Sequence, residues 1–221
     1  MPRPPGHSQE SSPPGRTITA EVASYLTPLL DKEKDKEEIA TLKERVATLR
    51  KLPYPITPIA VPLADGLTAT DLEDPTAKVT FDANGTGVGR PVSWITPKAA
   101  WLVYDPTGDG KIASGRQLFG NVTFWMFWSN GYGPLAALDD DRDGTLSGKE
   151  LAGLALWHDA NGNGVADPGE VKPLADHGIV AVSCKWEVLT GHADKIAFSP
   201  TGVTFKDGTT RPTFDLVLKA K

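Results

Sequence analysis

The stretch Asp139-Asp-Asp-Arg-Asp-Gly-Thr-Leu-Ser-Gly-Lys-Glu150 is the feature around which we expect the chain to be organised. A second stretch, Asp159-Ala-Asn-Gly-Asn-Gly-Val-Ala-Asp-Pro-Gly-Glu170, repeats its pattern. Both stretches have oxygen-bearing side chains at positions 1, 3, 5 and 9, a glycine at position 6 and a glutamate at position 12. So many matching positions in one frame, found twice, make a strong pattern.

The spacing has a chemical reason. Ca²⁺ takes about six to eight oxygen ligands at about 2.3–2.6 Å. Alternate residues of a tightly coiled loop point inward, position 7 offers its backbone carbonyl, and glycine at position 6 permits a positive φ. The glutamate at position 12 binds through both oxygens, so the pattern predicts two EF-hand-type calcium loops. The expected ligands are Asp139, Asp141, Asp143, Thr145, Ser147, Glu150, Asp159, Asn161, Asn163, Val165, Asp167 and Glu170.

Two further stretches match the pattern less well. Residues 105–116 have Asp105, Thr107 and Asp109 at positions 1, 3 and 5, glycine at position 6 and Lys111 at position 7, but arginine at position 12. Residues 82–93 end on serine and offer no bidentate carboxylate. A metal-free explanation stays open for all of these loops, because Asp- and Gly-rich turns also bond to their own backbone.

Composition narrows the class of protein. The 221 residues are 39% hydrophobic, as in an ordinary soluble globular protein, and the net charge is −5. This charge argues against a nucleic-acid partner, and much of the acidity lies in the two loops. Cys184 is the single cysteine, so no internal disulfide forms.

The sequence gives little information about the compartment in which the protein acts. No apolar run of eighteen residues is present, so we expect no membrane span. The first residues lack the apolar region of a secretory signal. We therefore expect either a protein that stays inside the cell or a chain presented without its beginning.

The chain divides into four segments by composition. Residues 1–17 are rich in proline and serine and are predicted to be disordered. Residues 18–52 are predicted to form a helical arm, whose apolar seam is a candidate surface for a protein partner or for self-association. Residues 53–77 read as a proline-rich linker or edge strand, and residues 78–221 as the calcium-binding body.

Within the body we expect an α+β fold. The two strong loops start 20 residues apart, which leaves room for one shared helix at 147–158 and not for separate exit and entry helices. The aromatic run at 118–128 predicts a helix buried on all sides, and a short helix is expected at 134–138. Predicted strands lie at 79–81, 101–104, 179–188, 196–198, 203–205 and 214–218, the last ones forming a β-meander.

The order of motifs also resembles a known family. Phe81-Asp82, Trp94, Leu118-Phe119-Gly120, Leu156-Trp157-x-Asp159 and Gly169-Glu170-Val follow one another along the chain. Residues 79–183 resemble the EF-hand-like calcium segment of large bacterial surface and repeats-in-toxin-type proteins. The resemblance implies a non-catalytic calcium-binding module, commonly outside the cytoplasm. That family usually has glutamate before Leu-Phe-Gly, where this chain has Gln117.

The leading hypothesis is a calcium-stabilised structural or interaction module. The alternative is a calcium sensor or a dockerin-like docking module, although glutamate at position 12 and the expected shared helix depart from the dockerin pattern. We do not expect an enzyme, because the four histidines lack metal-ligand spacing and no nucleophile elbow or phosphate loop is present.

Overall fold

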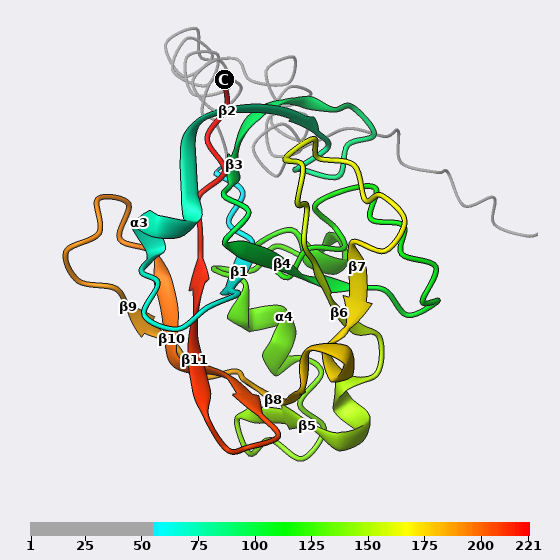
Figure 1. Cartoon of the computed structure of the whole chain (residues 1–221), viewed down its shortest axis with the longest axis vertical. Coiled ribbons are helices and arrows are strands. Elements are labelled where there is room, and N and C mark those ends of the chain that lie inside the picture. Colours follow the sequence, from blue (N-terminus) through cyan, green and yellow to red (C-terminus); the bar gives the residue numbers. More distant parts are fainter. Residues whose placement is uncertain (1–54) are drawn as a thin grey trace, which may run out of the picture. The chain divides into compact units, whose positions relative to one another are not determined.

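The computed structural model describes residues 55–221, and its main feature is a curled, antiparallel sheet (Figure 1). Strands account for 37% of the described residues and helices for 12%. The strand order is β5-β8-β10-β11-β1-β4-β6-β7, with β9 paired to β10. A separate hairpin, β2–β3, crosses one end of the body (Figure 1). The predicted disordered tail and helical arm lie outside the described residues.

The strands of the main sheet are β1 (Ile59–Pro62), β4 (Ala99–Tyr104), β5 (Thr145–Ser147), β6 (Leu154–Trp157), β7 (Val171–Pro173), β8 (Ile179–Ser183), β9 (Glu187–Val188), β10 (Ala197–Phe205) and β11 (Thr210–Asp215). The hairpin consists of β2 (Glu73–Phe81) and β3 (Arg90–Ile95). The helical segments are short: α3 (Ala69–Leu72), η2 (Thr123–Trp125), α4 (Tyr132–Ala136), η3 (Gly148–Leu151) and η4 (Leu174–His177).

The centre of the sheet is buried on both faces. Along β4, Trp101 and Val103 belong to one hydrophobic cluster, whereas Ala100 and Leu102 belong to the other. Successive side chains of a strand point to opposite faces, so the sheet separates two cores. This double burial explains why the strand reads as a continuous apolar run.

The β2–β3 hairpin covers one face with aromatic side chains. The ring of Trp94 on β3 lies 5.4 Å from Trp101 and 5.6 Å from Trp157, both in edge-to-face geometry. Phe81 on β2 lies 5.2 Å from Trp94. Pairs at these distances add to the stability that burial alone provides. The hairpin is therefore packed against β4 and β6 by a four-ring cluster.

Helix α4 helps to cover the opposite face. Tyr132 and Leu135 of α4 pack there with Phe119 and with the apolar residues of β1, β4 and β6. The Tyr132 hydroxyl is buried and donates to the backbone oxygen of Thr213 at 2.8 Å. The predicted entry helix at 134–138 thus exists as α4, shifted toward the N-terminus.

The expected α+β fold with a shared helix is wrong. Residues 147–158 contain η3, a glycine with φ of 81° at Gly153, and strand β6. All four residues of β6 are buried, and β6 pairs with β4 on one side and β7 on the other. A surface helix would leave one face of Leu154–Trp157 exposed. A strand between two neighbouring strands of a covered sheet has both of its faces buried.

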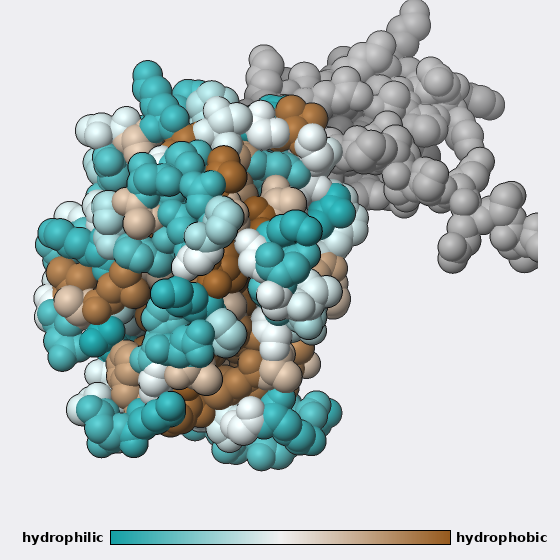
Figure 2. Space-filling view, turned by 45° about the vertical axis from the view of Figure 1, so that its right-hand side comes forward, coloured by the Kyte–Doolittle hydropathy of each residue, from teal (hydrophilic) through white to brown (hydrophobic). Residues whose placement is uncertain are grey.

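The predicted buried helix at 118–128 is also wrong. Only Thr123–Trp125 is helical, as a 3-10 turn in which Phe124 and Trp125 have φ of 58° and 59°. Such values cost about 1–3 kcal/mol per residue outside glycine. Trp125, Met126 and Phe127 are 37%, 54% and 43% exposed. Figure 2 shows one face of the molecule, on which apolar residues lie among hydrophilic ones.

The strands at 79–81 and 101–104 are confirmed, within β2 and β4. The strands expected at 196–198 and 203–205 form one long strand, β10, with a bulge between Ser199 and Val203. The structure places Ile59–Pro62, expected as linker or edge strand, inside the sheet between β11 and β4. That part of the expected linker therefore belongs to the body.

The carboxyl group of Asp215 is buried at the end of β11. It is 3% exposed and accepts a hydrogen bond from the backbone N–H of Gly131 at 3.0 Å. Burial raises the pKa of this carboxyl well above its usual range. The folded protein therefore holds Asp215 in its neutral form at pH values where the unfolded chain has ionised it.

We expect Asp215→Asn to flatten the pH dependence of stability. The unfolded carboxyl ionises near about pH 4, so this group's contribution to stability falls as pH rises from there toward the raised folded pKa. The asparagine keeps an oxygen for Gly131 and does not ionise. The free energy of unfolding of the variant, relative to wild type, should rise by up to about 1.4 kcal/mol per pH unit. Urea unfolding in chelator between about pH 5 and about pH 7 measures this difference. A difference that stays constant with pH would contradict the neutral state of Asp215.

Candidate metal centre

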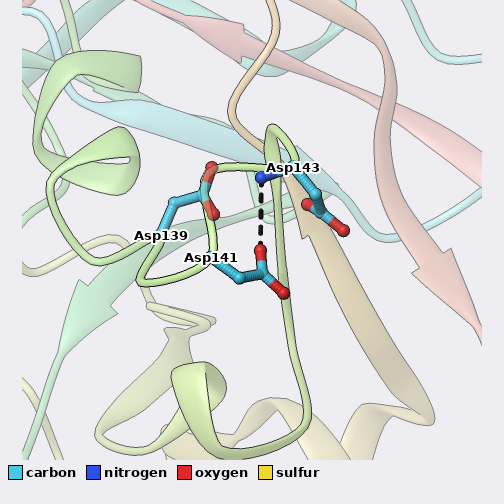
Figure 3. A group of neighbouring side chains, drawn as sticks. All are labelled: Asp139, Asp141 and Asp143. Atoms are coloured by element: carbon cyan, nitrogen blue, oxygen red, sulfur yellow. Dashed lines mark hydrogen bonds between the residues drawn. The ribbon is translucent and has the colours of Figure 1, made fainter.

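Three aspartates gather in the loop between α4 and β5. Asp139, Asp141 and Asp143 each offer a carboxylate oxygen, and these atoms lie within 4.8 Å of one another. Figure 3 shows the three side chains projecting from one tight turn of the chain. The loop at 139–150 thus brings together its residues at positions 1, 3 and 5.

The two carboxylate oxygens of Asp139 have different surroundings. Oδ2 accepts a hydrogen bond from the backbone N–H of Gly144 at 2.9 Å. Oδ1 is buried and has no hydrogen-bond partner within residues 55–221. Asp141 accepts from the N–H of Asp143 at 3.2 Å, which draws the turn tight (Figure 3). A buried anionic oxygen without a partner is costly, and a cation is the simplest group to satisfy it.

The two glutamates at position 12 close their loops in the same way. Glu150 accepts from the backbone N–H of position 2, Asp140, at 2.9 Å and from position 9, Ser147, at 3.0 Å. Glu170 accepts from Ala160 at 3.1 Å and from Asp167 at 3.2 Å, which are the same two positions. Each glutamate thus returns to the start of its loop.

The loop at 159–170 lies deeper than the first. Asp159 is 2% exposed. Its Oδ2 accepts from the N–H of Gly164 at 2.8 Å and from the indole N–H of Trp94 at 2.7 Å. Its Oδ1 accepts from the N–H of Asn163 at 3.1 Å. The first ligand position of this loop is therefore held from inside the hydrophobic core.

The remaining polar side chains of this loop bond to one another. The side-chain amides of Asn161 and Asn163 each donate to Asp167 Oδ2 at 2.9 Å. These two hydrogen bonds lower the pKa of the Asp167 carboxyl. The side chains at positions 3, 5 and 9 thus lie together. Val165 at position 7 has no oxygen in its side chain, so its backbone carbonyl is the group it offers.

Gly164 is required by packing as well as by conformation. Its φ is 71°, and an added Cβ would lie 2.1 Å from Cγ1 of Val79 on β2. The loop at 159–170 therefore rests directly against the β2–β3 hairpin.

In the other loop, Thr145 and Ser147 lie on β5, which pairs with β8.

Each of the four loops contains the same hydrogen bond between its positions 1 and 6. The aspartate at position 1 accepts from the N–H of the glycine at position 6, at distances of 2.8 to 3.0 Å. The aspartates are Asp82, Asp105, Asp139 and Asp159. The loops therefore differ less at their beginnings than at their ends.

The loop at 105–117 is closed by an amide. Gln117 Oε1 accepts from the N–H of Ala113, and Gln117 Nε2 donates to the backbone oxygen of Lys111, both at 2.8 Å. Thr107 contacts Asp105 at 3.4 Å, and the side chain of Lys111 pairs with Asp109 at 3.3 Å. The oxygen expected as the position 7 ligand thus already accepts a hydrogen bond from Gln117.

Sequence reasoning missed two residues beside the second loop. Trp94 donates to Asp159, and the indole N–H of Trp157 donates to Glu170 Oε2 at 3.3 Å. Both tryptophans belong to the motifs quoted above. Trp157 precedes Asp159 by two residues, so the sequence alone could predict that it lies near the loop. The contact of Trp94 spans 65 residues, and no local pattern indicates it.

Within residues 55–221, no helix combines the length and the apolar character that a membrane crossing needs.

The chain is similar to known proteins over most of its length. The family model described as the SPM domain matches residues 63–219. The iron-regulated protein FrpA of Neisseria meningitidis serogroup C is 30% identical over 171 residues, which cover 72% of this chain and 15% of that protein. The chain thus spans a small part of the length of this relative. From the match over residues 63–219, the chain belongs to the SPM domain family.

Proposed function

We propose that the chain is a calcium-stabilised structural or interaction module in which loops 139–150 and 159–170 each bind one Ca²⁺. The proposal is carried by Asp139 Oδ1, which is buried and has no hydrogen-bond partner among residues 55–221. Asp141 and Asp143 place further carboxylate oxygens within 4.8 Å of the Asp139 carboxylate. Three carboxylates that close repel one another, and a divalent cation removes the repulsion and supplies the missing partner.

The donor set is one that Ca²⁺ favours. The first loop offers the carboxylates of Asp139, Asp141, Asp143 and Glu150, together with the carbonyl of Thr145. The second loop offers Asp159 and Glu170 as carboxylates, the side chains of Asn161, Asn163 and Asp167, and the carbonyl of Val165. Hard oxygen donors of this kind, without sulfur or imidazole, suit Ca²⁺ better than Zn²⁺ or copper.

A structural role fits the surroundings of the loops better than a sensor role. A sensor opens a pair of helices when calcium binds. Here the segment between the loops contains β6, a strand hydrogen-bonded on both sides. Opening it would expose both cores, so we infer that calcium holds this body together. The resemblance to the calcium segment of large bacterial surface proteins, which we predict from the sequence motifs of residues 79–183, would agree with such a role.

We infer that the loop at 105–117 binds no calcium. Its position 7 carbonyl accepts from Gln117, and the neighbouring Arg116 donates to the backbone oxygen of Gly85. Arg116 thus stands at position 12, where the strong loops have a glutamate, and the amide of Gln117 follows it. The expected number of calcium ions per chain is two.

Calcium should raise the melting temperature. An ion that binds only the folded protein adds RT ln(1 + [Ca]/Kd), about 2.7 kcal/mol per site at a hundredfold excess over Kd. Two sites correspond to about 10 °C or more for a body of this size. Thermal unfolding followed by circular dichroism, in millimolar calcium and in chelator, measures the shift. Equal melting temperatures would contradict the proposal.

Glu150→Gln and Glu170→Gln should each remove one calcium ion. Each change deletes the bidentate carboxylate and leaves the length of the side chain unchanged. Calorimetric titration with Ca²⁺ should give about half the wild-type stoichiometry for either variant and no high-affinity binding for the double variant. Glu187→Gln is the matched control, because it removes the same charge from an exposed position on β9. A control that loses as much binding would show that net charge alone matters.

Gln117→Glu should create a third, weaker site. The substitution removes the N–H that donates to the carbonyl of Lys111, the position 7 oxygen, and supplies a carboxylate beside it. Calcium titration should then give three ions per chain in place of two. If the variant still binds two, the missing carboxylate is not what distinguishes this loop from the others.

A further inference from the structure

We propose that Trp94 and Trp157 are positioning residues of the calcium site at 159–170, which they connect to the hydrophobic core. This inference rests on the proposed function of that loop. Each indole N–H donates to a carboxylate that the loop offers to the ion: Trp94 to Asp159, and Trp157 to Glu170. These two carboxylates are the first and last side-chain ligands of the loop.

Trp94 fixes the first ligand. Its side chain is 2% exposed, and its N–H lies 2.7 Å from Asp159 Oδ2. Asp159 Oδ1 accepts from the backbone of Asn163, on the opposite side of the carboxylate. Donors to both oxygens leave the carboxylate little rotational freedom. Because Oδ2 also accepts from the N–H of Gly164, one lone pair of Oδ1 is left, and it is available to an ion.

Trp157 fixes the last ligand. It lies at the end of β6, two residues before the loop begins, and is fully buried. Its N–H and that of Asp167 both donate to Glu170 Oε2, at 3.3 and 3.2 Å. Trp94 and Trp157 are themselves in contact, with ring centroids 5.6 Å apart. One rigid pair of rings therefore sets the separation of the two carboxylates.

The loop at 139–150 lacks this support. Within residues 55–221, Asp139 and Glu150 accept hydrogen bonds from backbone groups of their own loop and from no side chain. The two sites are therefore unequal: one is preorganised by the core, and the other takes its shape from its own backbone. Outer hydrogen bonds to metal ligands change affinity by about 10- to 100-fold.

Trp94→Phe tests the inference, with Trp101→Phe as the matched control. Both changes replace a buried indole of the same aromatic cluster with a smaller ring. The indole N–H of Trp101 has no hydrogen-bond partner within residues 55–221, so only the Trp94 change removes a bond to a ligand. Both are made in the Glu150→Gln background, which leaves the site at 159–170 as the one titrated with CaCl₂. We expect Trp94→Phe to weaken calcium binding by about 10- to 100-fold and Trp101→Phe to leave it within about twofold. Trp157→Phe should resemble Trp94→Phe.

The outcomes separate the inference from the proposed function. If the wild-type protein binds no calcium, the proposed function fails, and the inference fails with it. If the wild type binds two ions but Trp94→Phe and Trp101→Phe bind equally tightly, only the inference is overturned. Equal weakening by both substitutions also overturns it, because general loss of core packing would then explain the result.

A second measurement needs no change in the core. In the Glu150→Gln protein, the ¹⁵N–¹H signals of the indole groups are followed during calcium addition. The signals of Trp94 and Trp157 should shift when the site at 159–170 fills, and that of Trp101 should shift least. In Glu170→Gln, where the other site fills, the same two signals should stay in place. Shifts of equal size at all three indoles would overturn the inference.

Discussion

The structure depends on burying both faces of strands β4 and β6. Side chains of β6 alternate between two cores, so Trp157 packs with the β2–β3 hairpin while Leu156 packs with α4 and its neighbours. Because β6 also runs between the loops at 139–150 and 159–170, the position of both loops follows from this burial. Separating the strand from either neighbour would expose a core and displace a loop, which joins the proposed metal sites to the stability of the whole body.

At the proposed sites, close carboxylates need their repulsion reduced, and buried oxygens need a partner. Asp139, Asp141 and Asp143 place carboxylate oxygens within 4.8 Å of one another, and one Asp139 oxygen is buried with no partner in the part of the chain that the structure describes. The calcium ion that we propose here would meet both requirements at once, since it would neutralise the charges and give the oxygens a partner. At 159–170 the same requirement is met with fewer charges, because two asparagines replace aspartates and indole N–H groups share the stabilisation of Asp159 and Glu170.

The four loops share the geometry of their first turn and differ in the residue that closes them. Each begins with an aspartate that accepts from the glycine five residues on. Two of them return through a glutamate, one returns through the amide of Gln117, and the loop at 82–87 receives the Arg116 side chain from its neighbour. The closing residue, and not the shared turn, therefore separates the loops we propose as metal sites from those that hold themselves together by hydrogen bonds.

The sequence alone determined the parts that depend on short-range contacts. The loop frame, the closing positions of Glu150 and Glu170, and the strands that became β2 and β4 all follow from residues within about a dozen positions of one another. Tertiary structure decided the rest. Leu154–Trp157 is an apolar run that fits a helix or a strand equally well, and only its two neighbours in the sheet made it a strand. The contact of Trp94 with Asp159 joins residues 65 positions apart, so it exists only once the hairpin has packed onto the sheet.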